Sequence, residues 1–479
     1  PSLGLDAKDT GLARVSKHTR GYTMRLATTF GLAFALTGLV TTSLAEVSEQ
    51  IANRLEGDLT PMGAERAGNA AGTIPAWEGG LTAPPPGIGY NAGGHHPDPF
   101  AVDKPLYTVT SANKANYDGI LTDGHKALLA AYPDSFQMHV YPSRRSCAFS
   151  PQVYQSVKRN AVGGRMTRDE NGVTGALMAA PFPIPQSARE ILWNYELNFR
   201  GFKVIRPGAS AVPTKSGDFT IESYLDQLIF RWSDPSLRSS DDLGKVTMYV
   251  LKEGLTPPSS AGSMLLMHNT LNQVAHERHA WLYRPGERKV KRLNPPSYDM
   301  PFAGSDGLRA YDNFLVFNGA GDRFDWTLHG KQEKLIPYNL YKLASPELAY
   351  KDILHKQHLN PEPLRYELHR TWVVEGKLKA GQKHSAYARR QFYFDEDSWI
   401  PAVADLYDAK DRLYRVQEGH ILNYYEQPLC LVSSDVVYDL DAGRYHIMGL
   451  RNQEEEIRFD ADLDPEIFTS ESLRRAGVR

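Results

Sequence analysis

The stretch "RRQFYFDEDSWIPAVADLYDAKDRLYRVQ", from Arg389 to Gln417, predicts three consecutive β-strands joined by two turns. Aromatic and β-branched residues, which are typical of strands, dominate "QFYF", "WIPAVADLY" and "LYRVQ". The acidic runs "DEDS" and "DAKDR" separate these segments, and Asp favours turns because its side chain hydrogen-bonds the local backbone. We therefore interpret the stretch as an antiparallel meander.

The carboxylates of this meander offer an alternative interpretation, a metal site or a catalytic cluster. Asp395, Glu396 and Asp397 are adjacent, whereas metal ligands are normally spaced along the chain, and the central Gly of a calcium loop is absent. Turns are therefore favoured over a metal site. Asp405 lies inside a predicted strand, and we expect it to pair with a buried arginine such as Arg370 or Arg415.

Strand-like segments fill the chain after Phe202. In "RYELHRTWVVEGKL" (365–378), apolar residues alternate with polar ones, which predicts a strand with one buried and one wetter face. Arg370 falls on the apolar face, so it needs a carboxylate partner or serves as a ligand anchor. Helical patterns precede the strands, at about 112–131, at 151–160 and from Ser187 onward, and one inserted helix is predicted over 345–357.

The N-terminal region predicts export. Residues 24–45 contain a basic start, an apolar run and a small-x-small end, the order of a secretory signal peptide cleaved after Ala45. Glu46, not Cys, follows, so lipidation at this point is not indicated, and we expect a soluble periplasmic protein. We interpret residues 1–23, which precede this pattern, as a non-native or upstream segment. Residues 46–110 form a Gly/Pro-rich arm, and 111–479 a single domain with a mainly helical part (111–200) and a sheet (203–460).

Charge and motifs exclude several classes of function. The formal net charge is −2, and removing residues 1–45, with five basic and two acidic side chains, leaves −5, so nothing indicates nucleic-acid binding. "FNGAGDRFDW" (317–326) lacks the third glycine of a dinucleotide site, so we interpret it as a turn with a polar loop of Asp322, Arg323 and Asp325. His276 and His279 do not satisfy a zinc spacing. We therefore expect neither a metal nor another cofactor.

Two cysteines, Cys147 and Cys430, remain in the chain. In an oxidising compartment they either form a disulfide or stay as two separate buried thiols, and the sequence leaves both alternatives open.

The meander and "WLYRPGERKVKRL" resemble the LolA/LolB-type lipoprotein carriers of the bacterial periplasm. A closer resemblance, to the proteobacterial family called domain of unknown function 1329, covers nearly the whole mature chain. It rests on "PFPIP", "WNYELNFRG", "RHAWLYRPGERKVKR", "FNGAGDRFDW", "GKQEKLIPYN", "HLNPEPLRYELHRTWVVE" and "YARRQFYFDEDSW". These resemblances imply an α+β fold: a large curved antiparallel sheet, open as a half-barrel, with helices packed on one face and an extended N-terminal arm. They also imply envelope transport beside an RND-type inner-membrane exporter and an outer-membrane protein.

Our leading hypothesis is therefore a periplasmic carrier of a lipid or another hydrophobic molecule. The residues predicted to line or anchor its ligand are Trp281, Tyr283, Arg370, Trp372, Phe392, Phe394, Asp405 and Tyr407. One alternative is an exported hydrolase of lipid or glycan that uses Asp322, Asp325 or His369. Another is a non-catalytic scaffold of an envelope transport complex, with the arm wrapping a partner or its own sheet.

Overall fold

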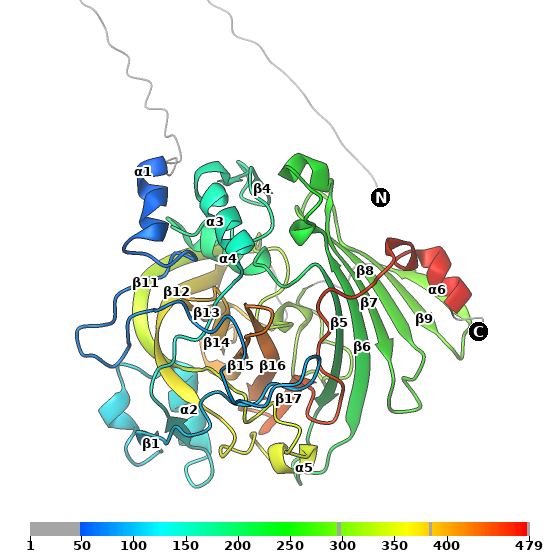
Figure 1. Cartoon of the computed structure of the whole chain (residues 1–479). Helices are drawn as coiled ribbons and strands as arrows, with labels where there is room; N and C mark the ends of the chain where they lie inside the picture. Colours follow the sequence, from blue (N-terminus) through cyan, green and yellow to red (C-terminus); the bar gives the residue numbers. More distant parts are fainter. Residues whose placement is uncertain (1–47, 295–297, 383–385, 477–479) are drawn as a thin grey trace, which may run out of the picture. The chain divides into compact units, whose positions relative to one another are not determined.

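One large sheet of 15 strands organises the computed structural model, which describes residues 48–294, 298–382 and 386–476 (Figure 1). The strand order is β1-β2-β12-β13-β14-β15-β16-β17-β5-β6-β7-β8-β9-β10, and β11 pairs with β12. Neighbouring strands are antiparallel except β2 and β12, which meet in parallel at Val140 and Tyr366. The sheet is curved and open, and the predicted fold class is confirmed. The predicted signal peptide (24–45) and residues 1–23 lie outside the described residues.

The strands of the large sheet have the following bounds: β1 (Tyr107–Val109), β2 (Met138–Val140), β5 (Lys203–Ala211), β6 (Ile221–Phe230), β7 (Val246–Gly254), β8 (Met264–Thr270), β9 (His279–Arg284), β10 (Lys289–Leu293), β11 (Phe324–Pro337), β12 (Tyr366–Leu378), β13 (Arg389–Asp395), β14 (Pro401–Tyr407), β15 (Leu413–Tyr424), β16 (Leu429–Asp439) and β17 (Arg444–Leu450). Two short strands, β3 (Arg165–Met166) and β4 (Val173–Thr174), pair separately.

The α-helices are α1 (Glu49–Ala52), α2 (Asp123–Ala131), α3 (Pro151–Gly163), α4 (Ala188–Glu196), α5 (Tyr350–Ile353) and α6 (Ser470–Ala476). Helix α2 packs on β14 and β15, α4 on β11 and β12, and α6 on β8 to β10. None of the helices in the described part of the chain has the length and hydrophobicity that crossing a membrane requires.

Two of the predicted helices begin after a serine cap, of which the sequence had predicted the one at Ser187. Ser150 and Ser187 accept hydrogen bonds from the backbone N–H groups of Val153 and Glu190. The helix predicted over 112–131 is instead split, because Thr122 caps a new helix, α2. The helix predicted over 345–357 is reduced to α5, because Leu354 leaves the helical conformation and forms a β-bridge further along the chain.

The predicted N-terminal arm packs on the sheet of its own chain. Several of its apolar side chains are buried, among them Leu55, Leu59, Met62, Ile74 and Trp77, whereas Ile51, Val102 and Leu106 are exposed. The Trp399 indole donates a hydrogen bond of 2.9 Å to the Met62 carbonyl of the arm. Strand β1 also lies within residues 46–110, so this segment is part of the compact unit that extends from Val47 onward.

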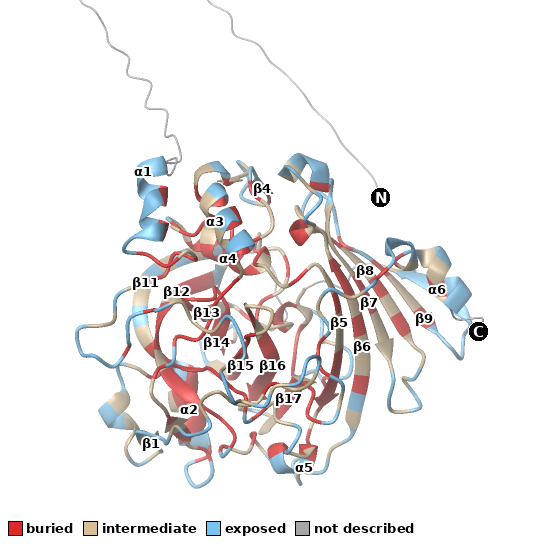
Figure 2. Ribbon diagram, viewed as in Figure 1, coloured by how far each residue is buried: buried red, intermediate tan, exposed pale blue. Residues whose placement is uncertain are grey.

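Burial differs between the two halves of the sheet (Figure 2). All seven residues of β14 are buried, whereas β7 has seven half-buried residues and two buried ones. A strand buried on both faces contributes to the core. Strands such as β7 are covered less completely, and a cavity lies against them.

Candidate ligand-binding cavity

A cavity of about 360 Å³ lies against one face of strands β5 to β9. Alternate residues of each strand point to this face, as the two-residue period of a strand requires. On β6 they are Tyr224, Asp226, Leu228 and Phe230. Ligand sites for small molecules typically enclose about 300–1,000 Å³, so this volume is in the range of a binding site.

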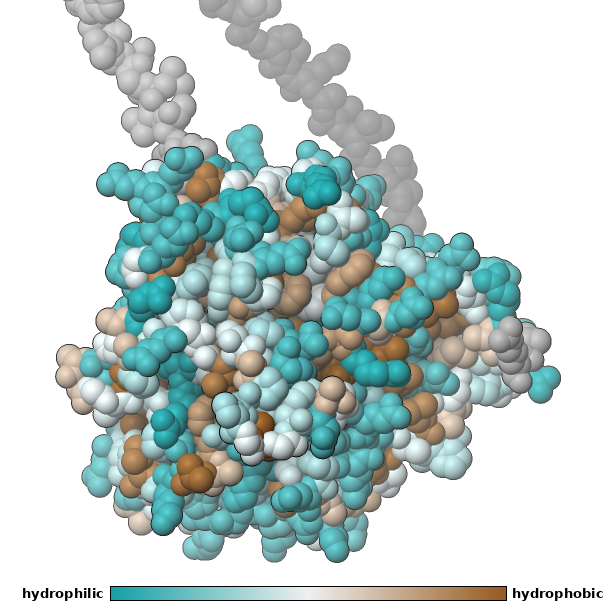
Figure 3. Space-filling model, in the orientation of Figure 1, coloured by the Kyte–Doolittle hydropathy of each residue, from teal (hydrophilic) through white to brown (hydrophobic). Residues whose placement is uncertain are grey.

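Most of the cavity wall is apolar. The β-strands contribute Val204, Leu228, Phe230, Met248, Val250, Met267, Leu282 and Val432, and the segment before β11 contributes Phe302, Phe314 and Phe317. Over β6 to β9, hydrophobic side chains also show at the molecular surface between hydrophilic ones (Figure 3). The cavity therefore offers an apolar ligand a large hydrophobic contact area.

The segment that lines the cavity from the side opposite β5–β9 has an unusual backbone. Leu315 and Val316 have φ angles of 49° and 75°, a region that β-branched residues such as valine rarely adopt. The Tyr195 hydroxyl donates to the Leu315 carbonyl, and the Val316 N–H donates to the Asn313 carbonyl. These bonds hold a strained backbone in place, as is common at binding sites.

A row of charged side chains crosses the cavity face of three strands. The strand register places Asp226 opposite Arg206 on one side and Lys252 on the other. Asp226 lies 2.9 Å from the Arg206 guanidinium and 2.7 Å from Lys252 Nζ. Burial alone would raise the pKa of Asp226, but the two cations lower it. Burial also lowers the pKa of Lys252 to about 8, despite the attraction of Asp226.

The charged residues of the cavity wall are predominantly cationic. Arg200, Arg206, Lys252 and Arg278 line it, against the carboxyl groups of Glu222 and Asp226, although the whole chain has a formal net charge of −2. These residues were not predicted from the sequence. A charged residue within an apolar strand, as in "DQLIF" and "KVTMYVLKE", was the sequence signal that could have indicated them. However, only the register of β6 against β7 shows that Asp226 and Lys252 are neighbours.

The predicted ligand-lining residues of β9 face away from the cavity. Leu282 lines it, whereas Trp281 and Tyr283 on the opposite face pack in a cluster with Phe468 and Leu473 near the C-terminus. The strand itself was predicted correctly. The prediction that its aromatic face binds the ligand was wrong, because residues around α6 cover that face.

The aromatic residues of β12 and β13 lie behind the cavity wall. Phe392 packs on the lining residue Phe317, with ring centroids 5.6 Å apart, and Phe394 packs on Tyr195 at 6.3 Å. Trp372 stacks on Trp399 at 6.4 Å. Phe392 and Phe394 therefore support the wall without lining it, and Trp372 does not line the cavity either.

The predicted pairing of Asp405 was wrong. Its carboxylate accepts hydrogen bonds from the Gly124 N–H of α2 and from the Tyr393 hydroxyl, at 3.0 and 3.1 Å. Tyr407, two residues further on, donates to Asp123 of the same helix. Burial raises the pKa of Asp405 to about 6. Asp405 and Tyr407 therefore attach α2 to the sheet.

The two arginines proposed for Asp405 pair elsewhere. Arg370 bonds Glu396 at 3.0 Å, and Arg415 bonds Asp439 at 2.7 Å. Arg370 also donates to the Ala67 carbonyl of the N-terminal arm, so it connects the arm to the sheet and does not anchor a cavity ligand.

The "DEDS" turn is buried, which the turn interpretation did not predict. Glu396 and Asp397 are 1% and 4% exposed. Arg145 donates to both carboxylate oxygens of Asp397, at 2.9 and 2.7 Å, and Lys331 lies 2.7 Å from Glu396. The acidic residues form a turn, but they also belong to a buried ion-pair network.

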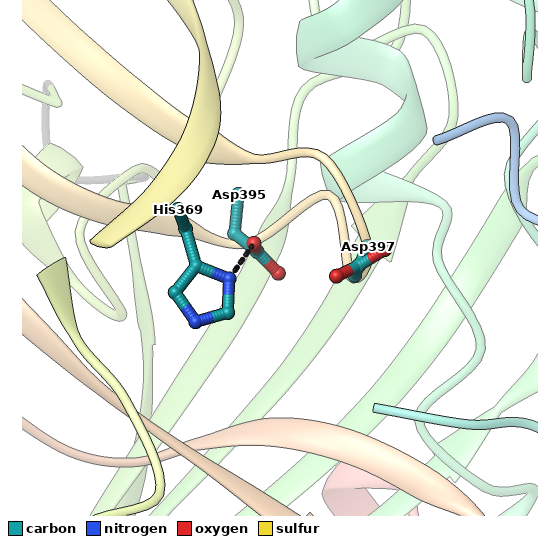
Figure 4. Close-up of side chains that lie close together, drawn as sticks. All are labelled: His369, Asp395 and Asp397. Atoms are coloured by element: carbon teal, nitrogen blue, oxygen red, sulfur yellow. Dashed lines mark ion pairs between the residues drawn. The ribbon is translucent and has the colours of Figure 1, made fainter. Parts of the chain in front are cut away.

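His369, Asp395 and Asp397 are the three side chains of this network that come close enough for a shared metal ion, with one atom of each within 4.8 Å of the others (Figure 4). The His369 ring lies 3.2 Å from Glu367 and 3.5 Å from Asp395. Burial alone would lower its pKa, but these carboxylates raise it to about 9. A protonated imidazole has no lone pair to donate to a metal, and both carboxylate oxygens of Asp397 already accept hydrogen bonds from Arg145. We therefore interpret the three side chains as members of ion pairs and not as metal ligands.

The residues proposed for hydrolysis do not meet in one site. Asp325 is exposed, Asp322 is half-buried, and Arg323 pairs with Asp299 at 3.3 Å. Asp325 lies opposite Lys377 in the sheet, eight residues along β12 from His369, which is roughly 26 Å at the rise of a strand. This separation removes the structural basis of the hydrolase alternative.

Cys147 and Cys430 are joined in a disulfide with a Cα–Cα distance of 5.7 Å. The bond connects the segment before α3 to β16 and spans 283 residues of sequence. Cys430 also lines the cavity, so the disulfide fixes part of its wall.

The open antiparallel sheet and the cavity on its face define an α+β half-barrel protein with an internal, ligand-sized space. The family model described as "Protein of unknown function (DUF1329)" matches residues 108–474. A Pseudomonas aeruginosa protein described as "Uncharacterized protein PA3922" is 40% identical over 456 residues, covering 93% of this chain and 97% of that protein. The chain belongs to the DUF1329 family, as its motifs predicted.

Solved structures similar to this chain include three bacterial proteins. A DUF1329 family protein from Desulfovibrio piger is 16% identical, with a TM-score of 0.39, over 57% of this chain and 92% of that chain. A putative outer membrane lipoprotein-sorting protein domain from Vibrio parahaemolyticus is 15% identical, with a TM-score of 0.42, over 60% and 99%. The LolA superfamily protein NE2245 from Nitrosomonas europaea is 13% identical, with a TM-score of 0.36, over 60% and 100%.

Proposed function

We propose that the protein binds and carries a hydrophobic molecule, such as a lipid, in the periplasm. The observation that supports this function is the cavity of about 360 Å³ with its mainly apolar wall. Burial of apolar surface contributes about 25 cal/mol per Å², so an aliphatic chain gains binding free energy from each carbon that enters the cavity. The signal-peptide pattern of residues 24–45 supports export into the periplasm.

Occupancy of the cavity tests this proposal. We expect native mass spectrometry of protein purified without detergent to detect a bound lipid, and a fluorescent fatty acid to bind with a stoichiometry of one. If no bound lipid is detected and the fluorescent fatty acid does not bind, the proposed function is refuted.

Two substitutions on adjacent residues of β7 locate the binding site. Met248 lines the cavity, whereas Tyr249 lies on the opposite face and stacks on Phe468 at 5.8 Å. Met248→Trp fills part of the cavity and is expected to weaken probe binding at least tenfold. Tyr249→Trp is the matched control and is expected to leave binding unchanged. Equal effects of the two substitutions place the bound probe outside the cavity.

A partnership with an inner-membrane exporter and an outer-membrane protein is a further part of the proposal, based on the family resemblance. Cross-linking in intact cells followed by affinity purification tests it. Since the N-terminal arm packs on the sheet of its own chain, we expect partner capture to depend on the exposed surface and not on release of the arm.

A further inference from the structure

Arg278, which lines the cavity immediately before β9, is a buried cation with few partners. The residue is 7% exposed, its Nη2 donates to Asn318 Oδ1 at 3.0 Å, and its guanidinium lies over the Tyr298 ring, 5.7 Å from the ring centroid. Its Nε has no hydrogen-bond partner, and no carboxylate of the described residues lies within ion-pair distance of it. Burying an unpaired charge is costly, so such a group normally has a partner.

Most of the other buried arginines in the described part of the chain pair with a carboxylate, whereas Arg189 donates to the Glu170 carbonyl. Arg309, which is fully buried, bonds the Asp435 carboxylate, and Arg145 bonds Asp397 in a bidentate pair. Arg278 differs from them because the space next to its guanidinium belongs to the cavity and not to a carboxylate. A bound anion would supply such a partner.

A side pocket of about 80 Å³ adjoins the cavity at Arg278. The two spaces share the lining residues Asn198, Arg200, Asn269, Arg278 and Asn318, so one ligand is able to occupy both. Arg200 adds a second cation, whose Nη2 donates to the Tyr195 carbonyl. The buried amide oxygen of Asn269 has no hydrogen-bond partner, so this amide is free to turn and donate its N–H groups.

One carboxyl group, that of Glu196, also lines the side pocket. Burial raises the pKa of Glu196 to about 7, although Arg189, Arg200 and Arg278 attract its charged form. Near neutral pH, Glu196 is therefore about half protonated and opposes a bound anion less than an ordinary glutamate does.

From this geometry we propose that the ligand is an amphiphile whose single anionic head group binds Arg278 and Arg200 in the side pocket, while its apolar chain lies in the main cavity. This inference rests on the proposed function and specifies its ligand class. An arginine guanidinium suits a carboxylate or phosphate because its N–H groups make paired hydrogen bonds to two oxygens. The apolar wall formed by Leu228, Val250 and Leu282 would then contact the chain.

Isothermal titration at pH 7.5 with dodecanoate, dodecan-1-ol and inorganic phosphate tests the proposal. The two aliphatic ligands share a chain, and phosphate represents a free anion. We expect the wild-type protein to bind dodecanoate at least tenfold more tightly than dodecan-1-ol, and phosphate much more weakly than either. Equal affinity for the two aliphatic ligands overturns the head-group site but leaves the carrier function standing. Tight binding of phosphate alone also overturns the proposal.

Substitution of Arg278 tests whether this residue causes the preference for dodecanoate over dodecan-1-ol. Arg278→Gln is expected to weaken dodecanoate binding about tenfold to a hundredfold, as loss of a charge-assisted hydrogen bond does, and to change dodecan-1-ol binding less than threefold. Arg278→Lys retains the charge and is expected to recover part of the preference. Arg292→Gln, at an exposed position of β10, is the control.

Thermal stability separates recognition from a structural role. Because Arg278→Gln removes an unpaired buried charge, its Tm is expected to equal or exceed that of the wild type. A lower Tm together with unchanged selectivity for dodecanoate means that Arg278 is structural, and overturns the proposal. Failure of the wild type to bind either aliphatic ligand, with no co-purified lipid, instead refutes the proposed function itself.

Discussion

His369 gives a quantitative prediction, because the structure connects its protonation to stability. The imidazole lies between Glu367 and Asp395, whose carboxylates raise its pKa from 6.5 to about 9 against the opposing effect of burial. The native state therefore keeps a proton that the unfolded chain releases in this interval. The contribution of this proton to the free energy of unfolding is complete below pH 6.5 and is lost as the pH rises through about 9. A pKa difference of this size corresponds to about 3 kcal/mol.

The substitution His369→Gln isolates this contribution. Glutamine retains hydrogen bonding but cannot take up the proton. Urea unfolding of both proteins at pH 6 and pH 9.5 gives the difference in their free energies of unfolding, and we expect this difference to be about 3 kcal/mol larger at pH 6. Lys252 and Glu196 also titrate near this range, but they are present in both proteins and cancel in the difference.

A difference that is the same at both pH values would refute the imidazolium assignment. A direct check is the NMR titration of the His369 ring protons, which should report a pKa well above 6.5. Repeating the unfolding with EDTA separates a metal site from an ion pair. If EDTA destabilises the wild type but not His369→Gln, the cluster of His369, Asp395 and Asp397 binds a metal, and the ion-pair interpretation is wrong.

Three further predictions concern buried groups. Replacing Cys147 and Cys430 by serine should lower the free energy of unfolding by about 3–5 kcal/mol, since the disulfide closes a long loop, as urea unfolding with and without reductant will measure. Arg145→Met leaves the buried Asp397 without its partner and should cost about 3–5 kcal/mol, while adding Asp397→Leu should recover much of that loss. Asp405→Asn should remove the part of the stability that the wild type loses as the pH rises from about 4 to 6, because native Asp405 keeps its proton over this interval while the unfolded chain releases it, as urea unfolding across this range will measure.

Local sequence signals predicted the elements of this fold well. The cap at Ser187 and the strand predicted from the alternation of residues 366–374 depend on neighbours within a few positions, and both are present in the structure. The wetter face predicted for this strand was wrong. The alternation does not show what covers each face of a strand. The polar face of β12, with Glu367 and His369, is as buried as its apolar face, because charged partners from elsewhere in the chain reach it.

Long-range pairing limited the prediction of the site. Glu65 and Glu396 both contact Lys331, although they are 331 residues apart, and no local pattern records such a meeting. In the same way, Asp226 and Lys252 are unremarkable in their own segments and become a charge pair only through the register of β6 and β7. Predicting the ligand-facing side chains would require the sheet order and the register, and the sequence supplied only the strands.

The two sets of buried charges differ in how completely they are paired, and this difference distinguishes structure from recognition. Around the "DEDS" turn, each of Arg145, Arg370 and Lys331 pairs with a carboxylate at 3.0 Å or less. These three cations therefore already have the carboxylate partners that a bound anion would otherwise supply. Arg278 has one amide hydrogen-bond partner and lies over the Tyr298 ring, but no carboxylate of the described residues pairs with it, so its desolvation is compensated only in part. If the proposed head-group site is correct, a ligand with one negative charge should gain more from this cavity than a neutral ligand of the same size.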